Sequence, residues 1–304
     1  MDPKNIYVFT DIDLDGTASL LALHWALNID ANNTKFKTTT VSNFRKEFLK
    51  WLETDSINNY DQVYFLDLDV STSADIVDHP KSVIIDHHVT HVQAKDIYKL
   101  AHTYIVETTS CAKLVYAYFK GTLKLDSNQK YFIVLADDYH CYKFAQPETS
   151  DLNCLFSNTQ RTLDKTRTHK FIERYYNGFV PFNVQERNII KEYTDGRDAA
   201  IKTLQIYTGK VSLGKNEYVV TGTMGRKYVN DVCDHLIKHY NSDVVFFINP
   251  TNQHVSFRKK KECPVNLAKL ATALCEGGGH EYSAGGKLTD TFLEFTKQLT
   301  LLEK

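Results

Sequence analysis

Short runs of apolar residues alternate with amphipathic segments along the first 140 positions of the chain. The β-branched and aromatic content of these runs predicts strands. The predicted strands cover residues 6–9, 63–66, 83–85, 104–106 and 132–135. Strands that alternate with helices in this way predict an α/β fold with an open, mostly parallel sheet and flanking helices.

Helical spacing of apolar residues occupies segments between these strands. The predicted helices cover residues 20–27, 42–52 and 110–120. Ser42 is the candidate N-cap of the second helix, which places Phe44, Phe48 and Trp51 on one face. These faces provide the apolar surface that a sheet needs on its two sides.

The second half of the chain has a different pattern. Residues 140–205 are polar and mainly helical in spacing, without strands. Beyond them, strands are predicted at 218–221, 244–248 and 254–257, and helices at 229–240 and 265–275. We therefore expect an N-terminal domain (1–190), a helical connector (191–209, around Asp195–Arg197) and a smaller C-terminal α/β domain (210–304), with a cleft between the two domains.

Charge is distributed unevenly over the two halves. The chain carries a net charge of −1, but residues 1–199 carry −5 and residues 200–304 carry +4. An acidic half suits cation binding, and a basic half suits an anionic substrate.

The composition also predicts where the protein acts. No run of about 18 apolar residues occurs, so we expect no membrane partner, and the N-terminal residues lack the regions of a signal peptide. None of the 6 cysteines forms a C-x-x-C pair. We therefore expect free thiols and a cytoplasmic location.

Acidic residues and histidines follow four of the predicted strands. They are Asp11, Asp13 and Asp15, then Asp67 and Asp69, then Asp86, His87 and His88, and finally Asp137 and Asp138. The carboxyl ends of parallel strands meet at one sheet edge, where ligands bind. Carboxylates crowded together repel one another unless cations are present. The pattern therefore predicts two divalent cations that bind a phosphate, and the mixture of carboxylate and imidazole favours Mn²⁺ over an all-oxygen Mg²⁺ site.

These segments resemble the motifs of the DHH phosphoesterase family. The four motifs are similar to Asp13-x-Asp15-Gly16-x-x-Ser19, Asp67-x-x-x-Ser71, Asp86-His87-His88-Val89-Thr90 and Leu135-Ala136-Asp137. Residues 109–112 resemble the helix start that follows the third motif. Residues 277–286 resemble the Gly-rich signature of the DHH-associated C-terminal domain, and Ser256-x-Arg258 lies upstream of it as in that domain.

The resemblance implies roles for individual residues. It implies metal contacts from Asp13, Asp15, Asp67, His87 and Asp137, with Mn²⁺ as the preferred ion and Mg²⁺ as an alternative. His88 and Asp86 are expected to be catalytic. Arg258, Gly278, Gly279 and His280 are expected to hold substrate phosphate.

The chain departs from the family pattern at two places. Many members that act on small substrates carry a histidine four residues before the first motif aspartate, where this chain has Phe9. Asp11 is then an additional candidate metal ligand. In the fourth motif Asp137 and Asp138 compete, and Asp137 is our first choice.

The sequence is compatible with several functions. The length resembles that of the nanoRNase, pAp-phosphatase and cyclic-dinucleotide hydrolase group, so we expect a phosphoesterase acting on short single-stranded oligonucleotides or small nucleotides. Oligomeric state is not predicted, and a homodimer is compatible with the pattern. The alternatives are a RecJ-like single-strand exonuclease, an inactive DHH scaffold protein and a haloacid-dehalogenase-like phosphatase, whose D-x-D-G-T signature Asp13–Thr17 also matches.

Overall fold

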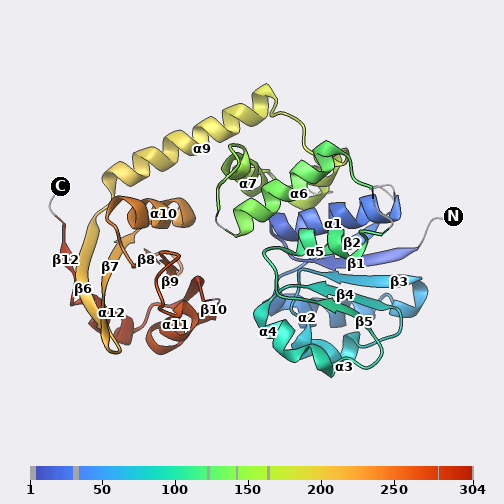
Figure 1. Cartoon of the computed structure of the whole chain (residues 1–304), viewed down its shortest axis with the longest axis horizontal. Helices are drawn as coiled ribbons and strands as arrows, with labels where there is room; N and C mark the ends of the chain where they lie inside the picture. Colours follow the sequence, from blue (N-terminus) through green and yellow to red (C-terminus); the bar gives the residue numbers. More distant parts are fainter. Residues whose placement is uncertain are drawn as a thin grey trace. The chain divides into compact units, whose positions relative to one another are not determined.

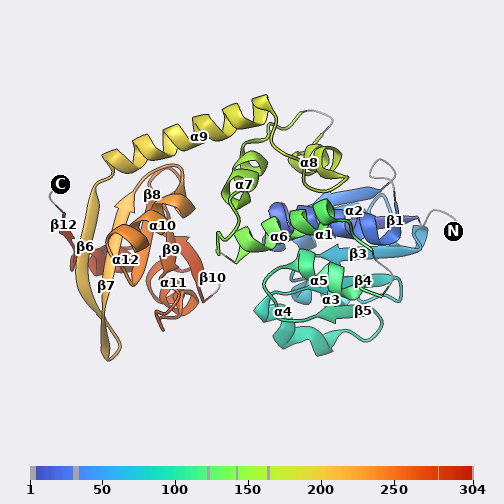
Figure 2. The same cartoon turned by 45° about the horizontal axis from the view of Figure 1, so that its top comes forward.

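A computed structural model describes residues 5–29, 34–121, 124–141, 143–162, 165–279 and 281–302. The chain divides into two compact units, Met1–Ile190 and Lys191–Lys304 (Figures 1 and 2). The long helix α9 (Val184–Thr203) contains this division, and Asp195–Arg197 lie inside it. In the part of the chain that is described, no helix is long and apolar enough to cross a membrane.

The N-terminal unit contains a five-stranded sheet in which all pairings are parallel. In sheet order the strands are β2 (Lys35–Thr38), β1 (Ile6–Thr10), β3 (Gln62–Leu66), β4 (Ser82–Asp86) and β5 (His102–Ile105). The predictions for β1, β3, β4 and β5 are confirmed. Strand β2 was not predicted, because its sequence Lys-Phe-Lys-Thr has one apolar residue and it lies at the sheet edge.

Helices bury both faces of this sheet. One apolar cluster contains residues of α1 (Leu14–Leu27), α5 (Cys111–Tyr118), α6 (Ser127–His140), α7 (Thr149–Asn158) and α8 (Arg167–Tyr175). The cluster on the other face is rich in aromatic rings and includes α2 (Val41–Leu52). There Phe9 lies 5.2 Å from Phe48 and stacks on Phe65 at 5.6 Å between ring centroids. Phe9 thus serves the core, so strand β1 has no side chain available for a ligand at this position.

Short elements complete this unit. They are the helices α3 (Ala74–Val77) and α4 (Val89–Ala94) and the 3-10 turns Ile57–Asn59, Ser71–Ser73 and Lys95–Ile97. Helix α4 begins directly after His88, so strand β4 passes into a helix within three residues.

Two local predictions were wrong. Residues 132–135 form part of helix α6, because the side chains of Asp126 and Gln129 cap the backbone reciprocally and start a helix at Ser127. Phe132, Ile133, Leu135 and Ala136 are buried along it, which is why a continuous apolar run resembled a strand. Ser42 lies inside α2, whose N-cap residue is Thr40.

The C-terminal unit contains a seven-stranded mixed sheet. In sheet order the strands are β10 (Gly278–Gly279), β11 (Ser283–Lys287), β9 (His254–Lys259), β8 (Val244–Asn249), β7 (Asn216–Met224), β6 (Ile206–Leu213) and β12 (Thr300–Leu301). Only the β7–β8 pairing among these is parallel. One apolar cluster joins the sheet to α10 (Val229–His239), and the other joins it to α11 (Leu267–Cys275) and α12 (Asp290–Thr296). The predicted strands and helices of this half are confirmed, as is the α/β fold class of both units.

The capping of α6 yields a first prediction. Asp126→Ala removes the acceptor for the Gln129 backbone N–H (2.9 Å) and should lower the free energy of unfolding of the N-terminal unit by about 0.5–2 kcal/mol. Asp126→Asn is the matched control, because its side-chain oxygen also caps a helix. Denaturant titrations of both variants measure the difference, and equal stability of Asp126→Ala and the wild type would contradict the role given to this cap.

Candidate metal centre

The first acidic segment forms the turn between β1 and α1. Asp13 is the N-cap of α1, and its carboxylate accepts a hydrogen bond from the Gly16 N–H at 2.9 Å. A Cβ on Gly16 would lie 2.4 Å from the carbonyl oxygen of Asp11, so only glycine permits this close approach. Burial, followed by the neighbouring charge of Asp13, raises the pKa of Asp11 to about 7. The turn therefore concentrates carboxylates at the carboxyl end of β1.

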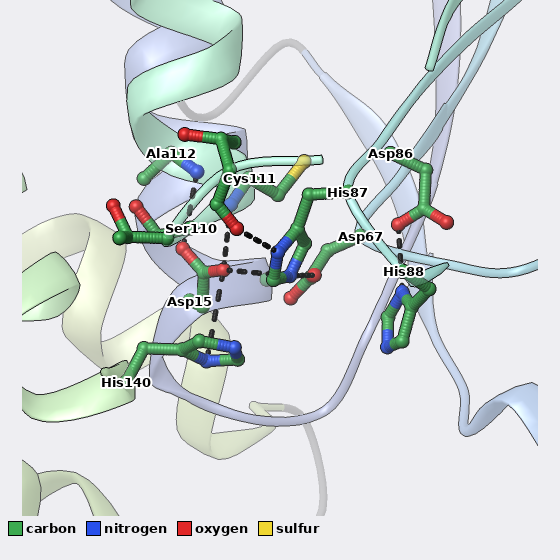
Figure 3. A network of polar contacts seen from close by, with 12 residues as sticks. Asp15, Asp67, Asp86, His87, His88, Ser110, Cys111, Ala112 and His140 are labelled. Atoms are coloured by element: carbon green, nitrogen blue, oxygen red, sulfur yellow. Dashed lines mark hydrogen bonds and ion pairs between the residues drawn. The ribbon is translucent and has the colours of Figure 1, made fainter. Parts of the chain in front are cut away.

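Asp15 is buried in the first turn of α1 and oriented by another helix. Its two oxygens accept hydrogen bonds from the backbone N–H groups of Cys111 (2.7 Å) and Ala112 (3.0 Å), at the start of α5. A helix N-terminus stabilises a negative charge. Each Asp15 oxygen keeps a further lone pair for another partner, and Figure 3 shows one of them pointing toward His87 and His140.

Asp67 follows β3 and makes an unusual buried contact. Its backbone has φ of 57°, a left-handed conformation that residues other than glycine adopt rarely. Its Oδ1 lies 3.2 Å from Nε2 of His87. Both atoms are shielded from solvent, and neither makes a hydrogen bond with suitable geometry among the described residues. Buried polar atoms normally have a partner, so this pair is incomplete as it stands.

The ring of His87 is fixed by its other nitrogen. Nδ1 lies 3.1 Å from the carbonyl oxygen of Thr108. Because a carbonyl only accepts, Nδ1 carries a hydrogen and Nε2 faces the carboxylates. Burial alone lowers the pKa of His87, but the close contact with the Asp67 carboxylate and its charge, with the charge of Asp15, raise it to about 10. Burial and the charge of Asp15 raise the pKa of Asp67 well above its usual range.

Asp86 connects two histidines. Its Oδ1 lies 2.8 Å from Nδ1 of His88, and its Oδ2 lies 2.7 Å from Nδ1 of the buried His91. Nε2 of His91 lies 2.6 Å from the hydroxyl of Tyr98. Burial raises the pKa of Asp86, but the two imidazole hydrogen bonds outweigh it and hold the pKa well below its usual range. Both oxygens are therefore occupied by imidazoles, so Asp86 orients His88.

The fourth motif lies on helix α6 instead of at a strand end. Asp137 accepts hydrogen bonds from the hydroxyls of Thr109 and Ser110 and lies 3.3 Å from the ammonium of Lys113. Asp138 points elsewhere, since it accepts from the backbone N–H groups of residues 145 and 146 and from the hydroxyl of Thr149. Asp138 thus stabilises the loop before α7, and Asp137 stabilises the start of α5.

Two groups of side chains place three candidate ligand atoms within 4.8 Å of one another. One consists of Asp15, His87 and His140, and the other of Asp67, His87 and His88. The second and third motifs supply Asp67, His87 and His88 of these residues. His140 was not predicted as a site residue. Because residues 132–135 were predicted to form a strand, the sequence did not indicate that His140 lies on the same helix as Asp137, three residues after it. The incomplete Asp67–His87 contact and the hard and borderline donors of both groups fit a divalent cation.

Asp69 has a structural role in the described residues. It accepts hydrogen bonds from the Ser71 N–H (3.0 Å) and from the hydroxyl of Thr90. These contacts join the turn after β3 to the start of α4.

The expected substrate residues of the C-terminal unit lie on neighbouring strands. Arg258 on β9 pairs with Ser283 on β11, which in turn pairs with β10. The guanidinium donates to the Asn230 side chain and to the Phe257 carbonyl, both at 2.7 Å. His280 lies outside the described residues.

Gly278 and Gly279, which are expected to hold substrate phosphate, form strand β10. A Cβ on Gly279, which has φ of 138°, would lie 2.7 Å from the Ala284 Cα, whereas one on Gly278 would meet nothing within 4 Å. The glycine at 279 is thus explained by strand pairing, and Gly278 is sterically open.

Comparisons with known proteins agree with this architecture. Residues 216–302 match the DHHA1 domain. No curated protein sequence matches the chain. Among solved structures, a DHH-domain protein described as a member of a family of ribosomal proteins has a TM-score of 0.66 at 14% identity, covering 97% of this chain and 86% of that one.

Two further structures extend the comparison. The pGpG-specific phosphodiesterase PggH from Vibrio cholerae has a TM-score of 0.61 at 11% identity, covering 97% of this chain and 96% of that one. RecJ from Thermus thermophilus, in complex with Mn²⁺, has a TM-score of 0.55 at 12% identity, covering 97% of this chain but only 51% of RecJ. The predicted resemblance to DHH proteins is confirmed by the DHHA1 match and by the shared fold.

The protonated Asp67–His87 pair yields a second prediction. A cation that binds there displaces the proton the pair holds, so Mn²⁺ binding should release about one proton near neutral pH. Because the proton competes with the metal, Mn²⁺ affinity should rise with pH while the pair remains protonated. Calorimetry in buffers with different ionisation enthalpies measures the release. An affinity that is independent of pH, with no proton release, would show that the ion does not bind at this pair.

Proposed function

We propose that the chain is a phosphoesterase that uses two divalent cations, with Mn²⁺ preferred, to hydrolyse phosphate esters in short oligonucleotides or small nucleotides. The observation that carries the proposal is the buried Asp67–His87 contact of 3.2 Å, whose atoms lack hydrogen bonds among the described residues. The side chains of Asp15 and His88 lie beside it. The fold shared with PggH and RecJ supports the same reaction class.

The residues at the sheet edge have distinct tasks. Asp15, Asp67 and His87 would hold the cations, with Asp11 and Asp13 as further ligands from the β1–α1 turn. Bound ions of this kind polarise a phosphate and activate water. Burial lowers the pKa of His88, but the hydrogen bond from its Nδ1 to Asp86 and the Asp86 charge raise it to about 9. Nε2 of His88 can therefore donate a proton to the leaving oxygen.

The C-terminal unit supplies groups that suit an anionic substrate. Asn230 orients the guanidinium of Arg258, which can bind a phosphate oxygen through its planar fork. The ammonium of Lys259 donates hydrogen bonds to the Cys263 carbonyl oxygen and to Glu281, so it is less suited to binding a phosphate. Arg258 is thus our candidate for the phosphate end of the substrate, and His280 and the Gly-rich strand remain proposed partners.

Small substrates fit the chain better than long ones. The chain shares its fold with a pGpG-specific phosphodiesterase over 96% of that chain. Its net charge of −1 offers little attraction for a long polyanion. We therefore place linear dinucleotides and pAp ahead of cyclic dinucleotides and longer single strands.

A substrate panel with Mn²⁺ tests this ranking. Dinucleotides or pAp should have the highest kcat/KM, and RNA and DNA versions of each length separate the two sugars. Faster turnover of long single strands would favour the RecJ-like alternative. An aspartyl-phosphate intermediate would favour the haloacid-dehalogenase-like one, and no metal-dependent turnover of any substrate would favour a scaffold protein.

The metal ligands yield a third prediction. Asp15→Asn and His87→Ala should each lower kcat by orders of magnitude, and chelation should abolish wild-type activity, because charge neutralisation at the phosphate is lost. Asparagine at position 15 keeps an acceptor for the start of α5. The exposed Asp96→Ala and His102→Ala are matched controls with unchanged kcat. Undiminished activity in excess chelator would eliminate the mechanism.

The hydrogen-bond chain behind His88 yields a fourth prediction. His91→Ala leaves Oδ2 of Asp86 buried without its donor and should lower kcat roughly tenfold. His91→Asn can place an N–H near the position of Nδ1 and should recover part of this loss. Steady-state kcat per folded molecule measures both. Equal losses in the two variants would assign His91 a packing role only.

A further inference from the structure

Helix α6 brings one titratable side chain to the sheet edge that the motifs do not contain. His140 is the last residue of α6. Its Nδ1 lies 3.8 Å from Oδ2 of Asp15, and its ring lies 4.9 Å from that of His87, edge to face. Figure 3 shows Asp15 between the two imidazoles. The three side chains come from α1, the end of β4 and α6.

The spacing of these atoms suits a shared ion better than direct hydrogen bonds. A distance of 3.8 Å between His140 and Asp15 exceeds that of a hydrogen bond, and His87 Nε2 lies 3.6 Å from the same oxygen. Ligand atoms about 2.0–2.2 Å from one small divalent ion stand roughly 3–4 Å apart. The buried Nε2 of His87 has no hydrogen-bond partner among the described atoms, which is the second observation that points to a ligand.

Asp137, one turn earlier on α6, is engaged differently. One of its oxygens accepts from the Thr109 and Ser110 hydroxyls, and the other faces the Lys113 ammonium at 3.3 Å. Ser110 is the N-cap of α5, whose first N–H groups hold Asp15. Asp137 is thus placed to fix the helix end that orients Asp15.

We propose that His140, and not Asp137, is the ligand that helix α6 contributes to a divalent-cation site formed with Asp15 and His87. This proposal rests on the proposed function for the presence of the ion. Asp137 is then a positioning residue that acts through α5. His87 belongs to both groups of donors, but its Nε2 has a single lone pair and would bind one ion only, here together with Asp15 and His140.

A simple ion pair predicts the opposite effect on metal binding. If His140 were only a protonated partner of Asp15, its removal would eliminate a positive charge beside the carboxylate and strengthen Mn²⁺ binding. If His140 is a ligand, its removal weakens binding. The sign of the change therefore separates the two roles.

Mn²⁺ titrations of the full chain by calorimetry test the proposal. His140→Ala should weaken binding at one site about tenfold or more, whereas Asp137→Asn, which keeps an acceptor for Thr109 and Ser110, should change it little. His102→Ala is the control for loss of a histidine from the same unit. Thermal unfolding of the metal-free proteins establishes that each variant is folded.

A spectroscopic readout identifies the nitrogen directly. Electron–nuclear double resonance of the Mn²⁺-loaded protein should lose one nitrogen coupling in His140→Ala and none in Asp137→Asn. Unchanged or tighter binding by His140→Ala, or loss of the ion on Asp137→Asn with all nitrogen couplings retained in His140→Ala, would overturn the proposal. In that case, loss of Mn²⁺ binding in His87→Ala would still support the proposed phosphoesterase function, and only the role of His140 would be wrong.

Discussion

The buried contact between Asp67 and His87 constrains the rest of the N-terminal unit. A carboxylate and an imidazole removed from water are costly unless their polar atoms have partners. Here Nδ1 of His87 lies within hydrogen-bonding distance of the Thr108 carbonyl oxygen, but Nε2 of His87 and Oδ1 of Asp67 lack hydrogen bonds among the described residues. The fold maintains this arrangement with a left-handed residue at Asp67. Such local strain persists only where the surrounding structure fixes it, and it is common at functional sites.

The architecture explains how residues far apart in sequence reach one place. Parallel strands β1, β3 and β4 end at the same sheet edge, and the N-terminus of α5 adds two backbone N–H groups that orient Asp15. Aromatic packing around Phe9 and α2 fills the opposite face of the sheet. The site is therefore built from rigid elements and short turns, an arrangement that holds ligand atoms at defined separations before an ion arrives.

The sequence allowed much of this site to be predicted, because contiguous motifs follow recognisable strands. Asp11–Asp15, Asp67 and Asp86–His88 lie at strand ends as expected. The position of Asp137 and the presence of His140 were not predictable in the same way. A four-residue apolar run does not distinguish a buried strand from a buried helix, and only the helix brings position 140 next to Asp15. The Gly-rich run shows a related limit, since a pattern expected to bind phosphate also satisfies close strand pairing at Gly279.

Crystallography of the protein with Mn²⁺, using anomalous scattering at the manganese edge, tests the central claim most directly. The account predicts anomalous density within bonding distance of His87 Nε2, an oxygen of Asp67 and an oxygen of Asp15, with the Thr108 contact of His87 retained. Density elsewhere on the protein, with Asp67 and His87 hydrogen-bonded to each other and no ion between them, would contradict it.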